Sequence, residues 1–151
     1  MKMIIDTSPL VIHMAGTYKK DMVNKVSLYN APNKELICME RLISAAAEIY
    51  ITPYVFAESF WLASSRLGKS KVVSVFENYK EMLLRFKDAV INKAEILNSE
   101  RLEFGPADVS LFLSARKLNY PILTSDTALI GFCRKNNVKV INFAEQVFSQ
   151  C

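Results

Sequence analysis

The stretch from Phe104 to Asp126 constrains the fold most, because a helix pattern and a strand pattern follow one another in it with an acid near each end. Gly105-Pro106 predicts a helix start, since proline is tolerated at the first helical position, and apolar residues then recur at helical spacing. Asn119-Tyr120-Pro121 breaks this helix, and residues 122–124 form a predicted short buried strand. The chain therefore goes out along a helix and returns along a strand.

The lengths of these two elements bring the two acids of the stretch level with each other. A helix of about thirteen residues spans roughly 20 Å at about 1.5 Å per residue, and about five extended residues recover roughly 16 Å at about 3.3 Å each. Asp126 thus returns close to the level of Asp108. Ligands bind at the carboxyl ends of the strands in an open parallel sheet, so we expect both acids at a ligand site.

The remainder of the chain alternates between the same two patterns. Short apolar runs predict strands at residues 3–5, 49–51, 89–91 and 138–141, and the segments between them carry helical periodicity or helix start and stop signals. Such alternation is typical of parallel sheets whose connections are helices. We therefore predict an α/β fold with one domain over residues 1–151, in which helices on both faces flank a central, mostly parallel sheet.

Two of the predicted helices begin with a capping residue followed by proline. Asp6 ends the first strand, and Ser8 is the expected cap of a helix that Gly16 ends. Thr52-Pro53 repeats this kind of start, and Gly68 is the matching stop signal. Asp6 therefore lies at a strand-to-helix turn, where the helix amides favour a negative charge.

Glu58 is an ionisable side chain on a helix that is otherwise apolar. It lies one turn from both Val55 and Leu62, and its neighbours in the sequence include large aromatic residues. An unpaired carboxylate is costly to bury. We therefore expect Glu58 to be buried with a cation, a hydrogen-bonding partner or a pocket.

Charge and hydrophobicity narrow the class of partner. The chain has 19 basic and 15 acidic residues, a net charge of +4; if four acids bind a metal, the other 11 leave +8 on the rest. A basic body around an acidic pocket suits a nucleic acid, whose phosphates need both attraction and a metal.

Although 51% of the residues are hydrophobic, no apolar run approaches the roughly 18 residues of a membrane span. The start MKMIID is unlike a secretory signal, so we expect a cytoplasmic protein with no membrane partner.

The cysteines and the single histidine form no recognisable metal motif. Cys38, Cys133 and Cys151 are widely separated without a CxxC, and only His13 adds an imidazole. This pattern argues against a zinc site and against a disulfide framework. We expect Cys38 and Cys133 to be buried apolar side chains, and His13 to be a core or surface residue rather than a substrate contact.

Four acids recur in characteristic surroundings: IIDTSPLV around Asp6, ITPYVFAES around Glu58, GPADVSLFLSA around Asp108 and ILTSDTAL around Asp126. VKVINF follows near the end of the chain. In this order, and over nearly the whole sequence, these segments resemble the PIN-domain family, in particular the small stand-alone ribonucleases that act as VapC-type toxins. VKVINF corresponds to the family's last strand.

The resemblance implies a PIN-like fold and a metal-dependent ribonuclease. By this analogy Asp6, Glu58, Asp108 and Asp126 converge as catalytic residues on Mg²⁺ or Mn²⁺, which prefer carboxylate oxygens. The metal would activate a water for attack on an RNA phosphodiester and would hold the scissile phosphate. Four hydroxyl side chains would hydrogen-bond the acids or the substrate: Thr7, Ser8, Thr124 and Ser125.

The resemblance also implies partners besides RNA, namely a second copy of the chain and, for a toxin, an antitoxin protein. Lys19, Lys20 and Lys25 follow the first helix and are candidate RNA phosphate contacts, with a solvated loop as the alternative. Many relatives carry a further acid shortly after the fourth one, where this chain has Thr127 and Ala128. A first metal is therefore well supplied with ligands, and both one metal and two metals before RNA binds stay open.

Other classes of protein match fewer of these residues. A receiver domain needs a second acid beside Asp6, where Thr7 stands, and a haloacid-dehalogenase-like phosphatase needs one at Ser8. Two alternatives stay open within the PIN resemblance: a catalytically silent PIN-like binding module and a housekeeping RNA-processing nuclease. A metal titration separates the first from an enzyme, and a neighbouring antitoxin gene separates the second from a toxin.

Overall fold

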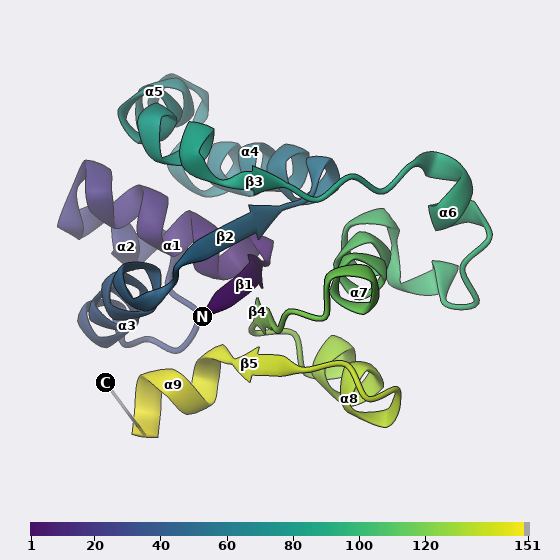
Figure 1. The fold of residues 1–151 in the computed structure, drawn as a ribbon. Helices are drawn as coiled ribbons and strands as arrows, with labels where there is room; N and C mark the ends of the chain where they lie inside the picture. Colours follow the sequence, from purple (N-terminus) through teal and green to yellow (C-terminus); the bar gives the residue numbers. More distant parts are fainter. Residues whose placement is uncertain (150–151) are drawn as a thin grey trace.

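Five short strands form the sheet of the computed structural model, which describes residues 1–149 (Figure 1). The strands are β1 (Lys2–Ile5), β2 (Glu48–Ile51), β3 (Lys87–Asp88), β4 (Ile122–Thr124) and β5 (Val140–Asn142). Their order across the sheet is β3-β2-β1-β4-β5, and neighbouring strands are parallel throughout. The predicted α/β fold with a parallel sheet is confirmed.

Helices connect the strands and flank both faces of the sheet. The helices are α1 (Thr7–Tyr18), α2 (Val23–Val26), α3 (Pro32–Ala45), α4 (Pro53–Leu67), α5 (Lys69–Arg85), α6 (Lys93–Leu97), α7 (Pro106–Leu118), α8 (Thr127–Lys135) and α9 (Phe143–Ser149), with short 3-10 turns η1 (Lys20–Met22) and η2 (Leu102–Phe104). α1 packs against α3, α4 and α5, whereas α7 packs against β1 and β4 (Figure 1).

The strand order reverses between β1 and β4. From β1 the chain moves through β2 to β3 on one side, and β4 and β5 then extend the sheet on the other side. In parallel sheets, ligands bind in the crevice at the carboxyl ends of the two strands that flank such a reversal. Asp6 follows β1 directly and Asp126 follows β4 after one residue, so both lie where a ligand site is expected.

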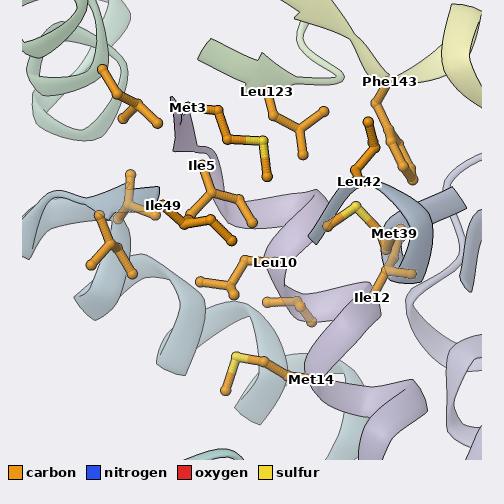
Figure 2. Close-up of a cluster of buried hydrophobic side chains, with 14 of the residues drawn as sticks. Met3, Ile5, Leu10, Ile12, Met14, Met39, Leu42, Ile49, Leu123 and Phe143 are labelled. Carbon is orange, nitrogen blue, oxygen red and sulfur yellow. The ribbon is translucent and has the colours of Figure 1, made fainter. Parts of the chain in front are cut away.

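The main core lies between α1 and the sheet, as Figure 2 shows. Met3, Ile4 and Ile5 of β1 are fully buried, and α1 is buried on nearly all sides from Pro9 to Ala15. A helix that is apolar all round belongs in a protein interior. The turn that carries Asp6 therefore joins two deeply buried elements of the chain.

The first helix begins earlier and ends later than the sequence indicates. Asp6, not Ser8, caps it, because the Asp6 carboxylate accepts a hydrogen bond from the Thr7 backbone N–H at 2.7 Å. The helix also continues through Gly16, which the sequence marks as its end. A Cβ at Gly16 would lie 2.2 Å from a Leu36 methyl carbon, so this glycine lets α1 and α3 approach closely.

The predicted third strand at residues 89–91 is wrong, because β3 ends at Asp88. Beyond β3, the Ala89 N–H still donates to a β2 carbonyl at 2.9 Å, but Val90 is 75% exposed. Ile91 packs in a separate small cluster with two residues of α6 and α7. The apolar run is thus divided between the sheet edge, the surface and a second core, which apolar content alone does not reveal.

Several other local signals are confirmed. Thr52 caps α4 by accepting the Val55 N–H at 3.1 Å, and Gly68 follows the helix with a φ of +92°. His13 is buried, and its Nδ1 shares a 2.6 Å hydrogen bond with the Tyr79 hydroxyl, as expected for a core histidine.

Two of the three cysteines are described by the structure. Cys38 and Cys133 are both fully buried, as predicted, whereas Cys151 lies outside the described residues. Along residues 1–149, no helix combines the length and the apolar character needed to cross a membrane.

Candidate active site

Asp6 stands at the carboxyl end of β1 with both carboxylate oxygens held. Oδ1 accepts the Thr7 N–H at 2.7 Å, and Oδ2 accepts the Thr124 hydroxyl at 2.6 Å. The residue is only 6% exposed. Burial raises the pKa of Asp6 to about 6, the two hydrogen bonds oppose this rise, and the negative charges of Glu58 and Asp126 add to it.

Asp126 follows β4 on the other side of the strand reversal and caps α8. Its Oδ1 accepts the Leu129 N–H at 3.0 Å. The Thr124 hydroxyl that donates to Asp6 also accepts the Asp126 backbone N–H at 3.1 Å. One buried hydroxyl therefore connects both acids and fixes the spacing between the two strand ends.

Asp108 comes to the same edge from the first turn of α7. Gly105, with a φ of +88°, lets the chain turn directly into this helix. The pKa of Asp108 is raised to about 7, first by burial and then by the negative charges of Asp6, Asp126 and Glu58. A hydrogen bond between the side chains of Asp108 and Asp126 contributes to the same rise.

Glu58 approaches the other three acids from α4, but it is exposed, so its expected burial is wrong. The reason is that α4 is only half-embedded. The buried positions of α4 are Val55, Ser59, Ala63 and Leu67. The Glu58 charge still raises the pKa values of Asp6 and Asp108, so its carboxylate lies near both. The four predicted acids are thus neighbours at one edge of the sheet.

A buried pair of hydroxyls, which the sequence does not indicate, ties α4 to α7. Thr52 Oγ1 and Ser110 Oγ are 2.8 Å apart, and Ser110 also donates to the Ala107 carbonyl at 2.6 Å. This contact fixes the start of the helix that carries Glu58 against the first turns of the helix that carries Asp108. No local pattern reveals it, because the two residues are 58 positions apart.

Glu35 is a second feature that the sequence analysis missed. This carboxylate is fully buried, and it accepts the Leu28 N–H at 2.6 Å, the Ala31 N–H at 3.1 Å and the Ser27 hydroxyl. Its carboxylate therefore replaces the hydrogen bonds that residues 27–31 would otherwise make to water. The available signal was an acid in the first turn of a helix preceded by an Asn-Ala-Pro turn.

The loop at residues 27–31 lies against the two remaining predicted hydroxyls. Ser27 and Leu28 line a small hollow together with Ser8. On the other side of the strand reversal, Tyr29 lies beside Ser125. Ser8 and Ser125 are thus half-buried against the loop that Glu35 holds, whereas Thr7 and Thr124 are buried beside Asp6.

The acids at this edge fit Mg²⁺ or Mn²⁺ by their chemistry. They supply only oxygen, which hard cations prefer, and within residues 1–149 none of them forms an ion pair with a basic side chain. The Thr7 hydroxyl, next to Asp6 in the sequence, is buried and has no hydrogen-bond partner within residues 1–149. As the side chains stand, no three Asp, Glu, His or Cys residues of the described chain are grouped to hold a metal. A cation would have to draw the carboxylates together.

The structure does not bring all three candidate RNA-binding lysines to the acids. Lys19 and Lys20 follow the end of α1, which has 12 residues and so spans roughly 18 Å from Asp6 at about 1.5 Å per residue. Lys25 lies on α2, and the next residue, Val26, lines the hollow beside Ser8. Of the three, Lys25 is the one whose segment returns toward the acids.

Comparisons with known proteins do not assign the chain to a family. No family model matches the chain, and no curated protein matches it. A similar solved structure is a domain of a functionally unknown protein from Methanocaldococcus jannaschii DSM 2661, with 19% identity and a TM-score of 0.46 over 93% of this chain and 89% of that chain. A similarity this weak says nothing about function.

Proposed function

We propose that this protein is a PIN-like, metal-dependent endoribonuclease that hydrolyses RNA phosphodiester bonds with Mg²⁺ or Mn²⁺. The observation that carries the proposal is the meeting of four carboxylates, from β1, α4, α7 and the end of β4, at the strand reversal. Burial is the main cause of the raised pKa values of Asp6 and Asp108, and the negative charges of the neighbouring acids add to it. A divalent cation is the ligand that relieves such repulsion. Acids with perturbed pKa values are typical of functional sites.

Each acid has a distinct role in this proposal. Asp6, which is held by Thr7 and Thr124, is the fixed ligand, while Asp108 and the exposed Glu58 close on the cation from two helices. Asp126 keeps Oδ2 for the cation because Oδ1 accepts the Leu129 N–H. When bound, the cation supplies an acidic water and neutralises charge on the phosphate. Without a cation, the four carboxylates would weaken the attraction of the basic body for RNA but would not cancel it, because the net charge stays +4.

RNA is the proposed substrate because the rest of the molecule is basic. With the four acids set aside, 19 basic residues face 11 acidic ones, which leaves a charge of +8. Such a body attracts phosphates to an acidic pocket that holds a metal. By resemblance, the nuclease acts in the cytoplasm as the toxin of a toxin–antitoxin pair. A short neighbouring reading frame for a DNA-binding protein would support this role, and its absence would favour an RNA-processing nuclease.

A homodimer is the second part of the proposal. α4 and α5 expose an apolar patch that consists of Phe56, Phe60, Trp61, Val73 and Leu84. Leu84 and Phe56 line a shallow hollow of about 290 Å³ on this patch. Exposed apolar side chains on two helices that pack together are typical of an interface, and a symmetric pair of copies covers such a surface on both partners.

RNA hydrolysis tests the proposed function directly. A single-stranded RNA should be cleaved by the wild type with Mg²⁺ or Mn²⁺ and left intact with EDTA. Asp108→Asn should abolish cleavage but keep the domain folded, because removal of one repelled acid need not destabilise the metal-free protein. Asp21→Asn, an exposed acid of η1, is the matched control and should cleave normally. Cleavage that survives both EDTA and Asp108→Asn would refute the proposal.

A further inference from the structure

Two arginines lie over phenylalanine rings on the outer side of α7 and α8. The Arg101 guanidinium is 4.9 Å from the Phe104 ring centroid and 5.0 Å from that of Phe132. The Arg116 guanidinium is 5.4 Å from the ring centroid of Phe112. The rings contact one another, with centroids 5.2 Å apart for Phe104 and Phe132 and 4.7 Å apart for Phe112 and Phe132.

These side chains border a hollow of about 400 Å³, which we call the arginine–phenylalanine pocket. It is lined by Phe112, Phe132, Arg101, Arg116, Asn98 and Glu100, among others. Its size is within the range of small-molecule sites, which run from about 300 to 1,000 Å³. Aromatic faces and guanidinium planes combined with amide and carboxylate groups are the surroundings in which proteins bind unstacked bases.

Arg116 differs from the other basic residues of this region in its partners. Arg101 pairs with Glu103 at 3.0 Å, Lys117 with Glu95 at 2.7 Å and Arg134 with Glu145 at 3.7 Å. Within residues 1–149, Arg116 forms no ion pair with a carboxylate, and its guanidinium lies over the Phe112 ring. Its side chain is exposed and lines the pocket, so a ligand in the pocket can reach the guanidinium.

The pocket lies along α7 and α8, the two helices that have Asp108 in the first turn and Asp126 at the cap, respectively. Phe112 is one turn beyond Asp108 on α7, and Arg116 is two turns beyond it, roughly 12 Å along the axis at about 1.5 Å per residue. Phe132 lies on α8, which Asp126 caps. In addition, burial raises the pKa of Cys133, the next residue of α8, and the nearby Asp108 charge adds to this rise. A strand of RNA at the acids can therefore place a neighbouring nucleotide in the pocket.

We infer that the arginine–phenylalanine pocket binds one nucleobase of a single-stranded RNA, a few nucleotides from the bond that is cut. The base stacks on the Arg116 guanidinium. That the ligand is RNA rests on the proposed function. Arginine suits this role better than lysine, because its planar group stacks on rings and is weakly hydrated. The pocket would thus hold the RNA by a base, while the acids act on its backbone.

Binding without cleavage tests the pocket. The affinity of a short single-stranded RNA is measured by fluorescence anisotropy in EDTA, beside a ribose-phosphate strand of equal length that lacks bases. Arg116→Ala should weaken RNA binding roughly 5- to 30-fold, the range expected for about 1–2 kcal/mol, and should leave binding of the base-free strand unchanged. Arg116→Lys should resemble Arg116→Ala, since lysine keeps the charge and loses the planar group.

Arg134→Ala is the matched control, because it removes an exposed arginine of α8 that contacts no ring within residues 1–149. It should change both affinities less than two-fold. Equal weakening for RNA and the base-free strand, or full rescue by Arg116→Lys, would make Arg116 a phosphate contact and overturn the pocket. Wild-type protein that neither binds nor cleaves RNA overturns the proposed function; wild-type cleavage with unchanged binding in Arg116→Ala overturns only the pocket.

Discussion

Thr124 shows how one side chain assembles the candidate site. Its hydroxyl donates a hydrogen bond to the Asp6 carboxylate and accepts one from the Asp126 backbone N–H. The distance between these two acids, which are 120 positions apart, therefore depends on Thr124. The residue is completely buried, which removes water as a replacement partner. Asp6 therefore depends on this hydroxyl for one of the two hydrogen bonds that hold its carboxylate.

Replacement of Thr124 by valine keeps the shape and removes the hydroxyl. Because Asp6 Oδ2 and the Asp126 N–H each lose a buried partner, Thr124→Val should cost about 1–3 kcal/mol of unfolding free energy. It should also reduce the rise in melting temperature that Mn²⁺ gives to the wild type, since a misplaced ligand weakens binding. Thr124→Ser should behave nearly as the wild type. A full Mn²⁺ shift in Thr124→Val would remove Thr124 from the site.

The raised pKa values of Asp6 and Asp108 predict how stability varies with pH. The pKa of Asp108 rises from 3.8 to about 7 on folding, and that of Asp6 to about 6, so the folded protein binds more protons than the unfolded chain between these values. Without metal, this contribution to stability is therefore present below pH 4 and is lost as the pH rises toward 7.

Asp108→Asn removes part of that dependence. Compared with the wild type in EDTA, the variant should melt at a higher temperature at pH 8 and show little difference at pH 4, in thermal scans at both values. His13, whose pKa burial lowers to about 4, acts in the opposite direction but is present in both proteins, so the difference between them isolates the acid. An equal change in melting temperature at both pH values would contradict the prediction.

At the scale of elements, the segment between α2 and α3 depends on Glu35. A carboxylate with no exposure accepts from backbone and side-chain donors of residues 27–31, and this loop supplies neighbours to Ser8 and Ser125. The loop is thus a fixed wall of the candidate site rather than a loose connection.

Glu35→Gln should weaken the hydrogen bonds that hold residues 27–31 in place. The amide replaces one acceptor oxygen by a donor that faces other donors, so we expect a loss of about 2 kcal/mol, within the range for hydrogen bonds to charged groups. Amide hydrogen exchange at Leu28 and Ala31 should accelerate by more than exchange in α5, which reports global opening. Lys34→Ala, at the exposed neighbouring position, is the control. Equal acceleration in the loop and α5 would mean that Glu35 acts only on overall stability.

How much of the fold the sequence predicts depends on how local each cause is. The start of α7 and the strand at residues 122–124 were predicted within a residue, because proline, glycine and short-range periodicity determine them. The passage of α1 through Gly16 was missed, since its cause is the side chain of Leu36 on another helix. Residues 89–91 were misassigned for the same reason, because their neighbours in space decide which of them is buried.

The candidate site divides in the same way. The four acids were identified by their local surroundings, and in the structure the charges of Glu58 and Asp126 act on the pKa values of both Asp6 and Asp108. Whether they hold a metal stays a prediction, because no three such side chains are grouped to do so in the described residues. The exposure of Glu58 was not predicted, because most of its neighbours in the sequence are apolar whereas only one face of α4 is buried. The contact between Thr52 and Ser110 joins distant segments, so the sequence of either segment is silent about it.

For the whole molecule, the exposed apolar patch of α4 and α5 predicts dimerisation. Leu84 belongs to this patch and is 74% exposed, so Leu84→Glu should keep the fold. The variant should be a monomer at a micromolar concentration at which the wild type is a dimer, as measured by light scattering. Leu97→Glu introduces the same charge at a position on α6 that is 64% exposed, and it should leave the dimer intact. A wild type that is monomeric at this concentration would remove the dimer from the proposal.

The position of β1 in the middle of the sheet has a consequence for synthesis on the ribosome. Its partner β2 is made early, but the edge that accepts β4 waits for residues 122–124. Asp126 is made 120 residues after Asp6, which takes roughly 6–24 s at about 5–20 residues per second. Until then, β1 of the nascent chain has no partner on the side that β4 occupies. Only three of the four acids, Asp6, Glu58 and Asp108, have been made. A chain that is released before residue 126 therefore lacks one of the four acids, and any activity that needs all four is expected only when synthesis is nearly finished.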